Sequence, residues 1–277
     1  MSHAPKKSPK SLKSRLGRLG KAALVAGSAT ALTFAMSNSA HAAVLNPLNE
    51  STTTFQKNFQ PVFDYDGNSC FPATAIDSSG TFNGGLDDSG SVTGQCRTGH
   101  LGKAQTYSRV KCNNGWCGIV YSLYFEKDMS CGDCTPTSHR HDWESAVIWV
   151  RQGASTPEYA SVSAHGEYTT SSWSSVQKDG VRLKVVYHKG GNVWDTHSFR
   201  FAKSGEVAEA WGDGGWDFPR LVSWNSYPGG SNTWTANLQT LMQSKTWGDA
   251  NFPLKDGRFN TELSRAKPSG ISFDPNA

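Results

Sequence analysis

The sequence lacks both a membrane-spanning run and an internal linker. Its N-terminal apolar stretch covers only residues 22–36 and is interrupted by Gly27, Ser28 and Thr30, whereas a spanning helix needs roughly twenty apolar residues. No Pro/Ser-rich or low-complexity segment divides residues 43–277, and these 235 residues are enough to bury a substantial core. We therefore expect one domain over residues 43–277.

The first 42 residues contain no acidic side chain. They carry seven lysines and arginines, followed by the apolar stretch and then Ala40-His41-Ala42. A basic segment, a short apolar segment and an A-x-A site in this order are typical of a secretory signal peptide. The sequence thus predicts a signal over residues 1–42 and a secreted, extracellular protein.

An excess of positive charge is also missing once this signal is removed. The whole chain has 27 basic and 23 acidic residues, and loss of the seven basic residues leaves 20 against 23, a net charge near −3. Nucleic-acid binding needs a concentrated positive surface, so we expect no nucleic-acid partner. Simple attraction to an anionic membrane surface, which favours basic patches, is not expected either.

The six cysteines all lie in the exported part, at positions 70, 96, 112, 117, 131 and 134. In an exported chain an even number of cysteines indicates disulfides, and six cysteines allow fifteen pairings. The C-x-x-C pattern from Cys131 to Cys134 is also compatible with a redox motif or half of a zinc site. Its position in a Gly/Asp/Thr/Pro loop, rather than at the start of a helix, favours a structural bridge.

Short runs of β-branched and aromatic residues alternate with glycine, serine, asparagine and aspartate. They predict strands over residues 104–110, 119–125, 145–151, 159–164, 181–188 and 197–202. No helix alternates with these strands, so we predict a mostly β protein, an antiparallel β-sandwich with a few peripheral helices. Helical spacing of Trp234, Leu238, Leu241 and Met242 predicts one packing helix near the C-terminus.

Ten tryptophans suggest carbohydrate binding, because flat aromatic faces stack on sugar rings. Trp149 and Tyr124 lie within apolar strand patterns and are expected in the core. Trp116, Trp211 and Trp216 lie in glycine-rich stretches, where an exposed ring is better accommodated. We treat these three as candidate ligand contacts.

A dense polar cluster runs from Ser138 to Glu144. Side chains alternate faces along a strand, which places Asp142 and Glu144 on one face and His139 and His141 on the other. Both faces become apolar after Glu144, so the carboxylates mark the point where a central strand emerges from the core. Either the chain turns between Ser138 and Asp142, so that His139 and Asp142 meet, or only the carboxylates share a site.

Carboxylates dominate this cluster, particularly if Asp128 joins it from upstream. Oxygen-rich ligand sets suit calcium, magnesium or manganese better than zinc, and the histidine spacing is not that of H-E-x-x-H. Two other interpretations stay open. Glu144 or His141 could carry protons in an acid/base pair, or the polar groups could simply end a strand, with Arg140 paired to a carboxylate.

The segment Ser138 to Glu144, SHRHDWE, resembles the GHRHDWE heptapeptide of the necrosis- and ethylene-inducing peptide-like proteins, a family of secreted microbial cytolysins. Further stretches are similar to other blocks of that family, so the resemblance covers most of residues 43–277. They are GIVYSLYFEKD (118–128), VSAHGEY (162–168), THSFRFA (196–202), FPRLVSWNSYP (218–228) and FPLKDGRF (252–259).

The resemblance implies a β-sandwich like that of actinoporins and fungal lectins, with a Ca²⁺ or Mg²⁺ ion at the mouth of a cleft. The ligands carried over are Asp128, His139, Asp142 and Glu144. Second-tier cleft candidates are His141, His165 and His197, and the disulfide common to the family corresponds to Cys70 with Cys96. The implied function is binding of glycosylinositol phosphorylceramide head groups at plant plasma membranes, followed by permeabilisation, necrosis and immune activation.

The chain departs from the family pattern at three places. Ser138 stands where glycine is usual, Glu126 stands where proline is usual, and the loop between Asp128 and Ser138 is longer and carries Cys131 and Cys134, as in a cysteine-richer branch. We expect a non-enzymatic protein, monomeric in solution. The alternatives are a lectin-like binder of plant sugars that does not lyse membranes, and a metal-assisted hydrolase using Glu144.

Overall fold

The computed structural model describes residues 44–133, 137–227 and 237–277. The predicted signal over residues 1–42 lies outside the described residues, as do Cys134 and Trp234. Within the described ranges, no helix has the length and apolar character needed to cross a membrane.

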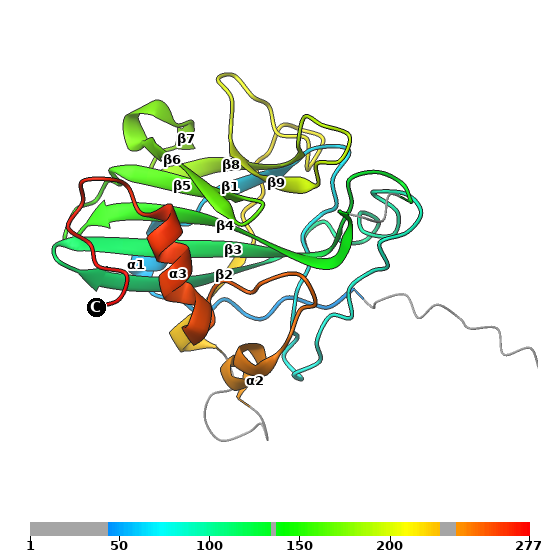
Figure 1. The fold of residues 1–277 in the computed structure, drawn as a ribbon, viewed down its shortest axis with the longest axis horizontal. Helices are drawn as coiled ribbons and strands as arrows, with labels where there is room; N and C mark the ends of the chain where they lie inside the picture. Colours follow the sequence, from blue (N-terminus) through cyan, green and yellow to red (C-terminus); the bar gives the residue numbers. More distant parts are fainter. Residues whose placement is uncertain (1–43, 134–136, 228–236) are drawn as a thin grey trace, which may run out of the picture. The chain divides into compact units, whose positions relative to one another are not determined.

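The larger of two sheets has six strands in the order β10, β2, β3, β4, β5, β6 (Figure 1). Their bounds are β2 Gln105–Asn113, β3 Trp116–Asp128, β4 His139–Arg151, β5 Tyr159–Ala164, β6 Glu167–Ser172 and β10 Arg220–Ser223. Neighbouring strands are antiparallel except for the parallel pair β10 and β2. The two central strands, β3 and β4, are the longest and form the frame of the site described below.

The smaller sheet is organised around β8, which pairs with each of its other three strands. Its members are β1 Val62–Tyr65, β7 Lys178–Asp179, β8 Arg182–Lys189 and β9 His197–Phe201. The pair β1 and β8 is parallel, and the other two pairs are antiparallel. The predicted sandwich is therefore confirmed, with one parallel pair in each sheet that the sequence pattern did not predict.

All six predicted strands are present, and so is the C-terminal helix, which is α2, Leu238–Ser244. Sequence reasoning missed the short strands β1, β7 and β10, the polar strand β6, and the helices α1, Thr54–Asn58, and α3, Asp256–Ala266. The signal for α3 was available, because its buried residues Phe259, Leu263 and Ala266 recur at helical spacing.

A first apolar core fills the space between the two sheets. Ile119, Tyr121 and Leu123 of β3 pack there with Val185 and Tyr187 of β8. Residues at every second position of a strand face the same side, and Ala146, Ile148 and Val150 of β4 also belong to this core. The even-numbered face of β4, which carries Asp142 and Glu144, thus continues into the interior of the sandwich.

A second apolar core covers the outer face of the larger sheet. Val147 and Trp149 of β4 pack there with Met242 of α2 and with Phe259 and Leu263 of α3. Figure 1 shows α3 lying across this face of the sheet. Trp149 and Tyr124 are fully buried, as predicted, because β4 and β3 have an apolar layer on both sides.

Two disulfides join described cysteines. The Cys70–Cys96 bridge expected from the family resemblance is present, and Cys112–Cys117 closes the hairpin between β2 and β3, where the two residues lie directly opposite each other. Cys131 is also disulfide-bonded. The sequence left the pairing of Cys131 and Cys134 open, and Cys134 is not among the described residues.

Candidate functional site

The candidate site lies where β3 ends and β4 begins. Antiparallel pairing places Asp128, the last residue of β3, directly opposite His139, the first residue of β4. The loop between them closes the hairpin, so the strand register alone brings these two side chains together. The longer loop of this chain does not prevent Asp128 from joining the cluster.

The chain turns at His141, and this turn brings His139 and Asp142 together. His141 has a φ of +62°, in the left-handed region, which is rare for a residue other than glycine. The ladder between β3 and β4 omits the pair Glu126 with His141, although the pairs on either side keep the same register. Ligand atoms of Asp128, His139 and Asp142 consequently lie within 4.8 Å of one another. Of the two arrangements that the sequence left open, the structure has the one in which the chain turns and His139 meets Asp142.

The segment from Asn83 to Leu86 occupies the gap that this irregularity leaves. The Leu86 N–H donates to the carbonyl of Glu126 at 2.8 Å, taking the position of a ladder partner. A Cβ added at Gly85 would lie 2.7 Å from Arg140 Cγ and from two ring atoms of His141. Close packing of this segment therefore holds His141 in its left-handed conformation.

Glu126 anchors the same segment from inside the protein. Its carboxylate accepts hydrogen bonds from Asn83 Nδ2 at 2.8 Å and from His100 Nε2 at 2.6 Å, and the Gly85 N–H donates to Asn83 Oδ1 at 2.9 Å. The exposed fractions of Glu126 and His100 are 1% and 2%. The glutamate that replaces the usual proline thus belongs to a buried polar network behind the site.

Two hydrogen-bond donors hold the buried carboxylate of Asp142. Tyr187 Oη donates to its Oδ2 at 3.0 Å and the Trp143 N–H donates to its Oδ1 at 2.8 Å. Burial and the negative charge of Asp128 raise the pKa of Asp142 to about 7, against the opposing effect of His139. The carboxylates of Asp128 and Asp142 have ligand atoms within 4.8 Å of each other and repel when both are ionised. A positive charge between them would stabilise both.

His139 is oriented by its own backbone neighbourhood. Its Nδ1 lies 2.7 Å from the carbonyl oxygen of His141. Because a carbonyl only accepts, Nδ1 carries the hydrogen and the lone pair of Nε2 stays available. Burial lowers the pKa of His139, but the charges of Asp142 and Asp128 outweigh this effect and raise it overall.

Glu144 lies one step further along the same face of β4. Ser163 Oγ of β5 donates to its Oε2, and burial followed by the charge of Asp142 raises the pKa of Glu144 well above its ordinary value. Glu144 lines the same cavity as Asp128, His139 and Asp142, but it is outside the group whose ligand atoms lie within 4.8 Å of one another.

His197 is the second-tier candidate with the most extensive contacts to the cluster. Its backbone N–H lies 2.9 and 3.1 Å from the two carboxylate oxygens of Asp128, and its Nδ1 lies 2.8 Å from Oδ1. Its Nε2 contacts the carbonyl oxygen of Asn68 at 3.1 Å. His197 therefore positions Asp128 from β9.

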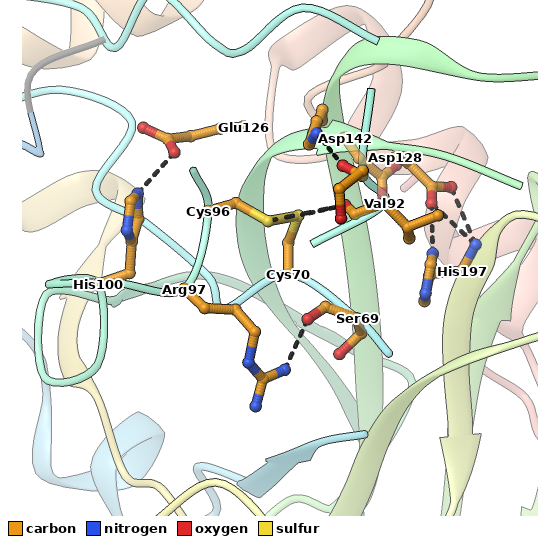
Figure 2. The surroundings of a disulfide bond; sticks show 12 residues. Ser69, Cys70, Val92, Cys96, Arg97, His100, Glu126, Asp128, Asp142 and His197 are labelled. Carbon is orange, nitrogen blue, oxygen red and sulfur yellow. Dashed lines mark hydrogen bonds and ion pairs between the residues drawn. A yellow bond between two sulfur atoms is a disulfide. The ribbon is translucent and has the colours of Figure 1, made fainter. Parts of the chain in front are cut away.

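The Cys70–Cys96 disulfide stands between this contact and the buried Glu126 network. Figure 2 shows the bridge between the Asp128–His197 pair and the His100–Glu126 pair. Arg97, next to Cys96, donates from Nη1 to the Ser69 carbonyl at 2.6 Å. The bridge thus fixes the segment that supplies the Asn68 carbonyl to His197.

The other two second-tier histidines differ. His165 lines the cavity, and its Nδ1 lies 3.5 Å from Thr196 Oγ1. The placement of His141 in the cleft was wrong. His141 lies on the same face of β4 as Trp143, and its side chain enters the outer core, where Nδ1 lies 2.6 Å from Tyr124 Oη and the ring contacts Trp247. Burial and nearby positive charges lower the pKa of His141 to about 4.

Tryptophan exposure was predicted correctly for one of three positions. Trp211 is 45% exposed, but Trp116 is 3% exposed and lies under the guanidinium of Arg151, 4.4 Å from its ring centroid. Trp216 is partly buried beside Lys184. Trp194, which the sequence pattern did not single out, is 57% exposed in the loop before β9 and lies close to His139 and His165.

The cluster opens into a cavity of about 270 Å³ that also extends to the C-terminal region. Carboxylates dominate its wall, and one guanidinium is present. The acidic residues are Asp128, Asp142, Glu144, Asp249 and Glu262, and the basic one is Arg258. Asp249 and Glu262 were not predicted, because nothing in the sequence links the C-terminal segment to the cluster around Asp142.

This donor set fits a hard divalent cation. Carboxylate oxygens with one or two imidazoles are suitable ligands for calcium or magnesium, and the three central groups already surround a common point. Hydrogen bonds from outside this group hold two of the carboxylates, since Tyr187 binds Asp142 and His197 binds Asp128. Asp128, His139 and Asp142 could therefore hold the cation directly, with Glu144 beside them.

The sequence matches one protein-family model over most of its length. The family model described as necrosis inducing protein (NPP1) matches residues 53–266. The chain belongs to this family. Over 223 residues it is 33% identical to the "Necrosis-inducing protein NPP1" of Phytophthora nicotianae, and the match covers 78% of this chain and 84% of the relative.

Solved structures of the necrosis-inducing family share the fold. Necrosis and Ethylene inducing Protein 2 from the causal agent of cocoa's Witches Broom disease has a TM-score of 0.67 at 28% identity, covering 81% of this chain and 95% of that one. NLPPya in complex with mannosamine gives 0.64 at 26%, covering 81% and 100%. The non-toxic HaNLP3 protein gives 0.65 at 25%, covering 82% and 98%.

Proposed function

We propose that this protein is a secreted cytolysin that binds glycosylinositol phosphorylceramide sugar head groups of plant plasma membranes through a divalent cation, and then permeabilises the membrane. The observation that carries the proposal is the convergence of Asp128, His139 and Asp142 at one point of a cavity lined by carboxylates. Membership of the necrosis-inducing family supports the toxic outcome.

Asp128, His139, Asp142 and Glu144 would hold the cation, either directly or through water. Bound there, Ca²⁺ or Mg²⁺ offers open coordination positions to the hydroxyl groups of a sugar. The protein's own side chains orient the site: His197 holds Asp128, Tyr187 holds Asp142 and Ser163 holds Glu144. The cavity then encloses a sugar ring next to these ligands, and no bond of the ligand has to be broken.

Sugar binding by a relative favours this reading of the cavity. NLPPya, which shares the fold, has been solved in complex with mannosamine. For the present chain we extend this to a lipid-linked sugar, because a head group displayed on a membrane gives a toxin a surface address without a hydrophobic anchor. The predicted signal over residues 1–42 would bring the protein to the extracellular side, where it would act as a monomer on the host membrane.

Vesicle leakage tests the proposal directly. Vesicles that contain the plant sphingolipid should release an encapsulated dye when the mature protein and Ca²⁺ or Mg²⁺ are present, and a chelator should stop the release. Plain phosphatidylcholine vesicles serve as the control. Equal leakage from both kinds of vesicle, or leakage that persists in chelator, would refute the head-group and cation parts of the proposal respectively.

A non-lytic sugar binder is the second candidate function, because the fold also occurs in the non-toxic HaNLP3 protein. The two functions share the site and differ in the outcome at the membrane. Binding to sphingolipid vesicles by co-sedimentation, together with dye retention at the same protein dose, would identify the non-lytic binder.

A further inference from the structure

A second pocket lies at the edge of the larger sheet where β10 is the outermost strand. It has a volume of about 200 Å³, and its lining shares no residue with the acidic cavity. Trp211 lines it together with Arg220, the first residue of β10, and three apolar side chains, those of Pro47, Ala104 and Pro219. We call it the Trp211 pocket. Because the cation ligands belong to β3 and β4, the two sites are formed by different strands.

Two exposed aromatic side chains line the Trp211 pocket. Trp211 is 45% exposed and Phe218 is 37% exposed, and the described residues include only three other large apolar side chains that are exposed. Trp211 is also the one candidate tryptophan from the glycine-rich stretches that is exposed. Aromatic rings at the surface of a concave site, with a few polar groups beside them, are typical of ligand binding.

The ring of Trp211 is held in place before any ligand binds. The N–H groups of Glu209 and Ala210, which precede it, donate to Oδ1 of the buried Asp64 at 2.8 and 3.1 Å. The indole itself hydrogen-bonds the carboxylate of Asp217. An aromatic side chain that is already ordered loses little conformational entropy on binding.

Asp217 is fixed in turn by the smaller sheet. Tyr65 Oη donates to its Oδ2 at 2.9 Å, and the Phe218 N–H donates to its Oδ1 at 3.0 Å. Its backbone exchanges two hydrogen bonds with Phe63 of β1, at 2.9 and 2.7 Å. The Asp217 side chain is 6% exposed, so it orients Trp211 from the interior and presents little of its charge to the pocket.

Arg220 supplies the accessible donors of the pocket. It is exposed, and its guanidinium has no hydrogen bond or ion pair with any other part of the chain that the structure describes. Two more cations cover the ring of Phe218, with Lys57 Nζ at 4.1 Å and Arg182 Cζ at 4.4 Å from its centroid. Trp211 is therefore the aromatic ring that stays available for a ligand, next to a guanidinium that needs acceptors.

A pyranose ring matches this combination. The C–H groups of a sugar face pack against an indole, and the oxygens at the edge of the sugar accept hydrogen bonds from a guanidinium. A hydrocarbon chain would cover the same indole but would offer Arg220 no acceptor, and a polar group buried without a partner is costly. The pocket thus favours a carbohydrate over a lipid tail.

We propose that the Trp211 pocket binds one sugar ring of a polysaccharide, stacked on Trp211 and hydrogen-bonded by Arg220. This site needs no cation and lies outside the acidic cavity, so the inference does not rest on the proposed function. It gives the protein a second attachment point, to an extended polymer rather than to a lipid head group.

Affinity electrophoresis in chelator measures this binding without any contribution from a cation. The mature protein is run in native gels that contain hydroxyethylcellulose, polygalacturonate or no polymer, and retardation as a function of polymer concentration gives the affinity. We expect retardation by at least one of the two polymers. The more effective polymer identifies the group that Arg220 binds as a hydroxyl or a carboxylate.

Two substitutions locate the site on the surface. Trp211→Ala should weaken polymer binding roughly tenfold, the loss of one stacked aromatic ring. The matched control is Trp194→Ala, which removes another exposed tryptophan, 57% exposed and beside His139, and should leave the binding unchanged. Arg220→Gln should weaken binding of polygalacturonate roughly tenfold, the loss of a charge-assisted hydrogen bond, and binding of the neutral polymer less. If Trp211→Ala fails to fold, Arg220→Gln decides.

Two results would overturn the proposal: no retardation of the wild-type protein by either polymer, or retardation that Trp211→Ala leaves unchanged. Binding to phosphatidylcholine vesicles that Trp211→Ala abolishes, without any polymer binding, would assign the surface to a membrane and refute the proposal equally. Asp142→Asn should lose cation binding and keep polymer binding, so failure of the cation site and failure of the Trp211 pocket are distinguishable.

Discussion

Two carboxylates that lie two residues apart on β3 each pair with a histidine, and the two pairs have different roles. Asp128 pairs with His197 at 2.8 Å, and Glu126 pairs with His100 at 2.6 Å. All four side chains are almost fully buried. The second oxygen of Glu126 accepts from the neutral amide of Asn83, whereas Asp128 shares its surroundings with two more carboxylates and an open cavity.

The difference shows that a buried acid–histidine pair does not by itself indicate a functional site. Around Glu126, the carboxylate is matched by its partners, and the network locks a segment of the chain. Around Asp128, negative charge exceeds the local positive charge, and the excess faces open volume. Uncompensated charge next to a cavity is the feature that identifies the ligand site.

The largest loss of stability should come from substitution in the His100–Glu126 pair. Glu126→Ala removes the carboxylate that both His100 and Asn83 bind, and removing one member of a buried pair costs about 3–5 kcal/mol. We expect a loss of this size in the free energy of unfolding, measured by urea denaturation. Glu126→Gln, which keeps an acceptor, should lose less; equal losses in the two variants would contradict the role assigned to the carboxylate hydrogen bonds.

Asp142→Asn should disturb the cluster around the Asp128–His197 pair and leave the fold intact, because asparagine has the shape of aspartate and its one amide oxygen can still accept from either Tyr187 or the Trp143 N–H. Mutation of a residue that only hydrogen-bonds a metal ligand lowers metal affinity by about 10–100-fold. Loss of a ligand itself should therefore lower Ca²⁺ or Mg²⁺ affinity by at least about 100-fold. Isothermal titration calorimetry measures this loss, and leaf necrosis should disappear with it. Retained toxicity would show that the bound cation is not needed for toxicity.

Alanine variants of the two histidines test whether the two carboxylate–histidine pairs differ in function. His197→Ala removes the group that orients Asp128 and should lower cation affinity about 10–100-fold. His100→Ala should lower stability but leave the cation affinity unchanged, because Asn83 and Leu86 still hold Glu126. Calorimetric titration of both variants with Ca²⁺ or Mg²⁺ at one temperature measures the two affinities. A similar loss of affinity in the two would show that the pairs are not functionally distinct.

The smallest expected effect is a pH dependence of stability. Burial disfavours the charged form of His100, but the hydrogen bond and charge of Glu126 outweigh burial and raise the pKa of His100 above its ordinary 6.5. A raised pKa gives stability that is fully present below pH 6.5 and is lost as the pH rises through the folded-state value. Relative to His100→Gln, the wild-type protein should therefore lose stability above pH 6.5 in denaturation curves.

Sequence reasoning predicted the sheets well because their strands carry clear apolar patterns. It also predicted that His139 and Asp142 meet only through an irregular strand. It could not show how the irregularity arises, since Gly85 and Leu86 lie far from β4 in the sequence. The misplacement of His141 came from the family resemblance, because alternation alone puts His141 on the face of β4 that carries Trp143 and Trp149, where the structure has it.

The C-terminal half of the cavity was beyond prediction for a different reason. Arg258 and Glu262 belong to α3, which folds across the outer face of the larger sheet, and Asp249 lies in the segment before that helix. Each residue on its own reads as part of a polar loop or the solvent side of a helix. Only the packing of Phe259 and Leu263 onto β4 and its neighbours determines which side chains turn toward Asp142.

Gly85 has a consequence for how such sites are found in other sequences. With a φ of +68° and no space for a methyl group, it tolerates no other residue without displacing His141. A search pattern restricted to the polar segment from Ser138 to Glu144 would accept chains that have every ligand but cannot bend the strand. A diagnostic signature for this site should therefore couple that segment to the distant glycine and read the two as one motif.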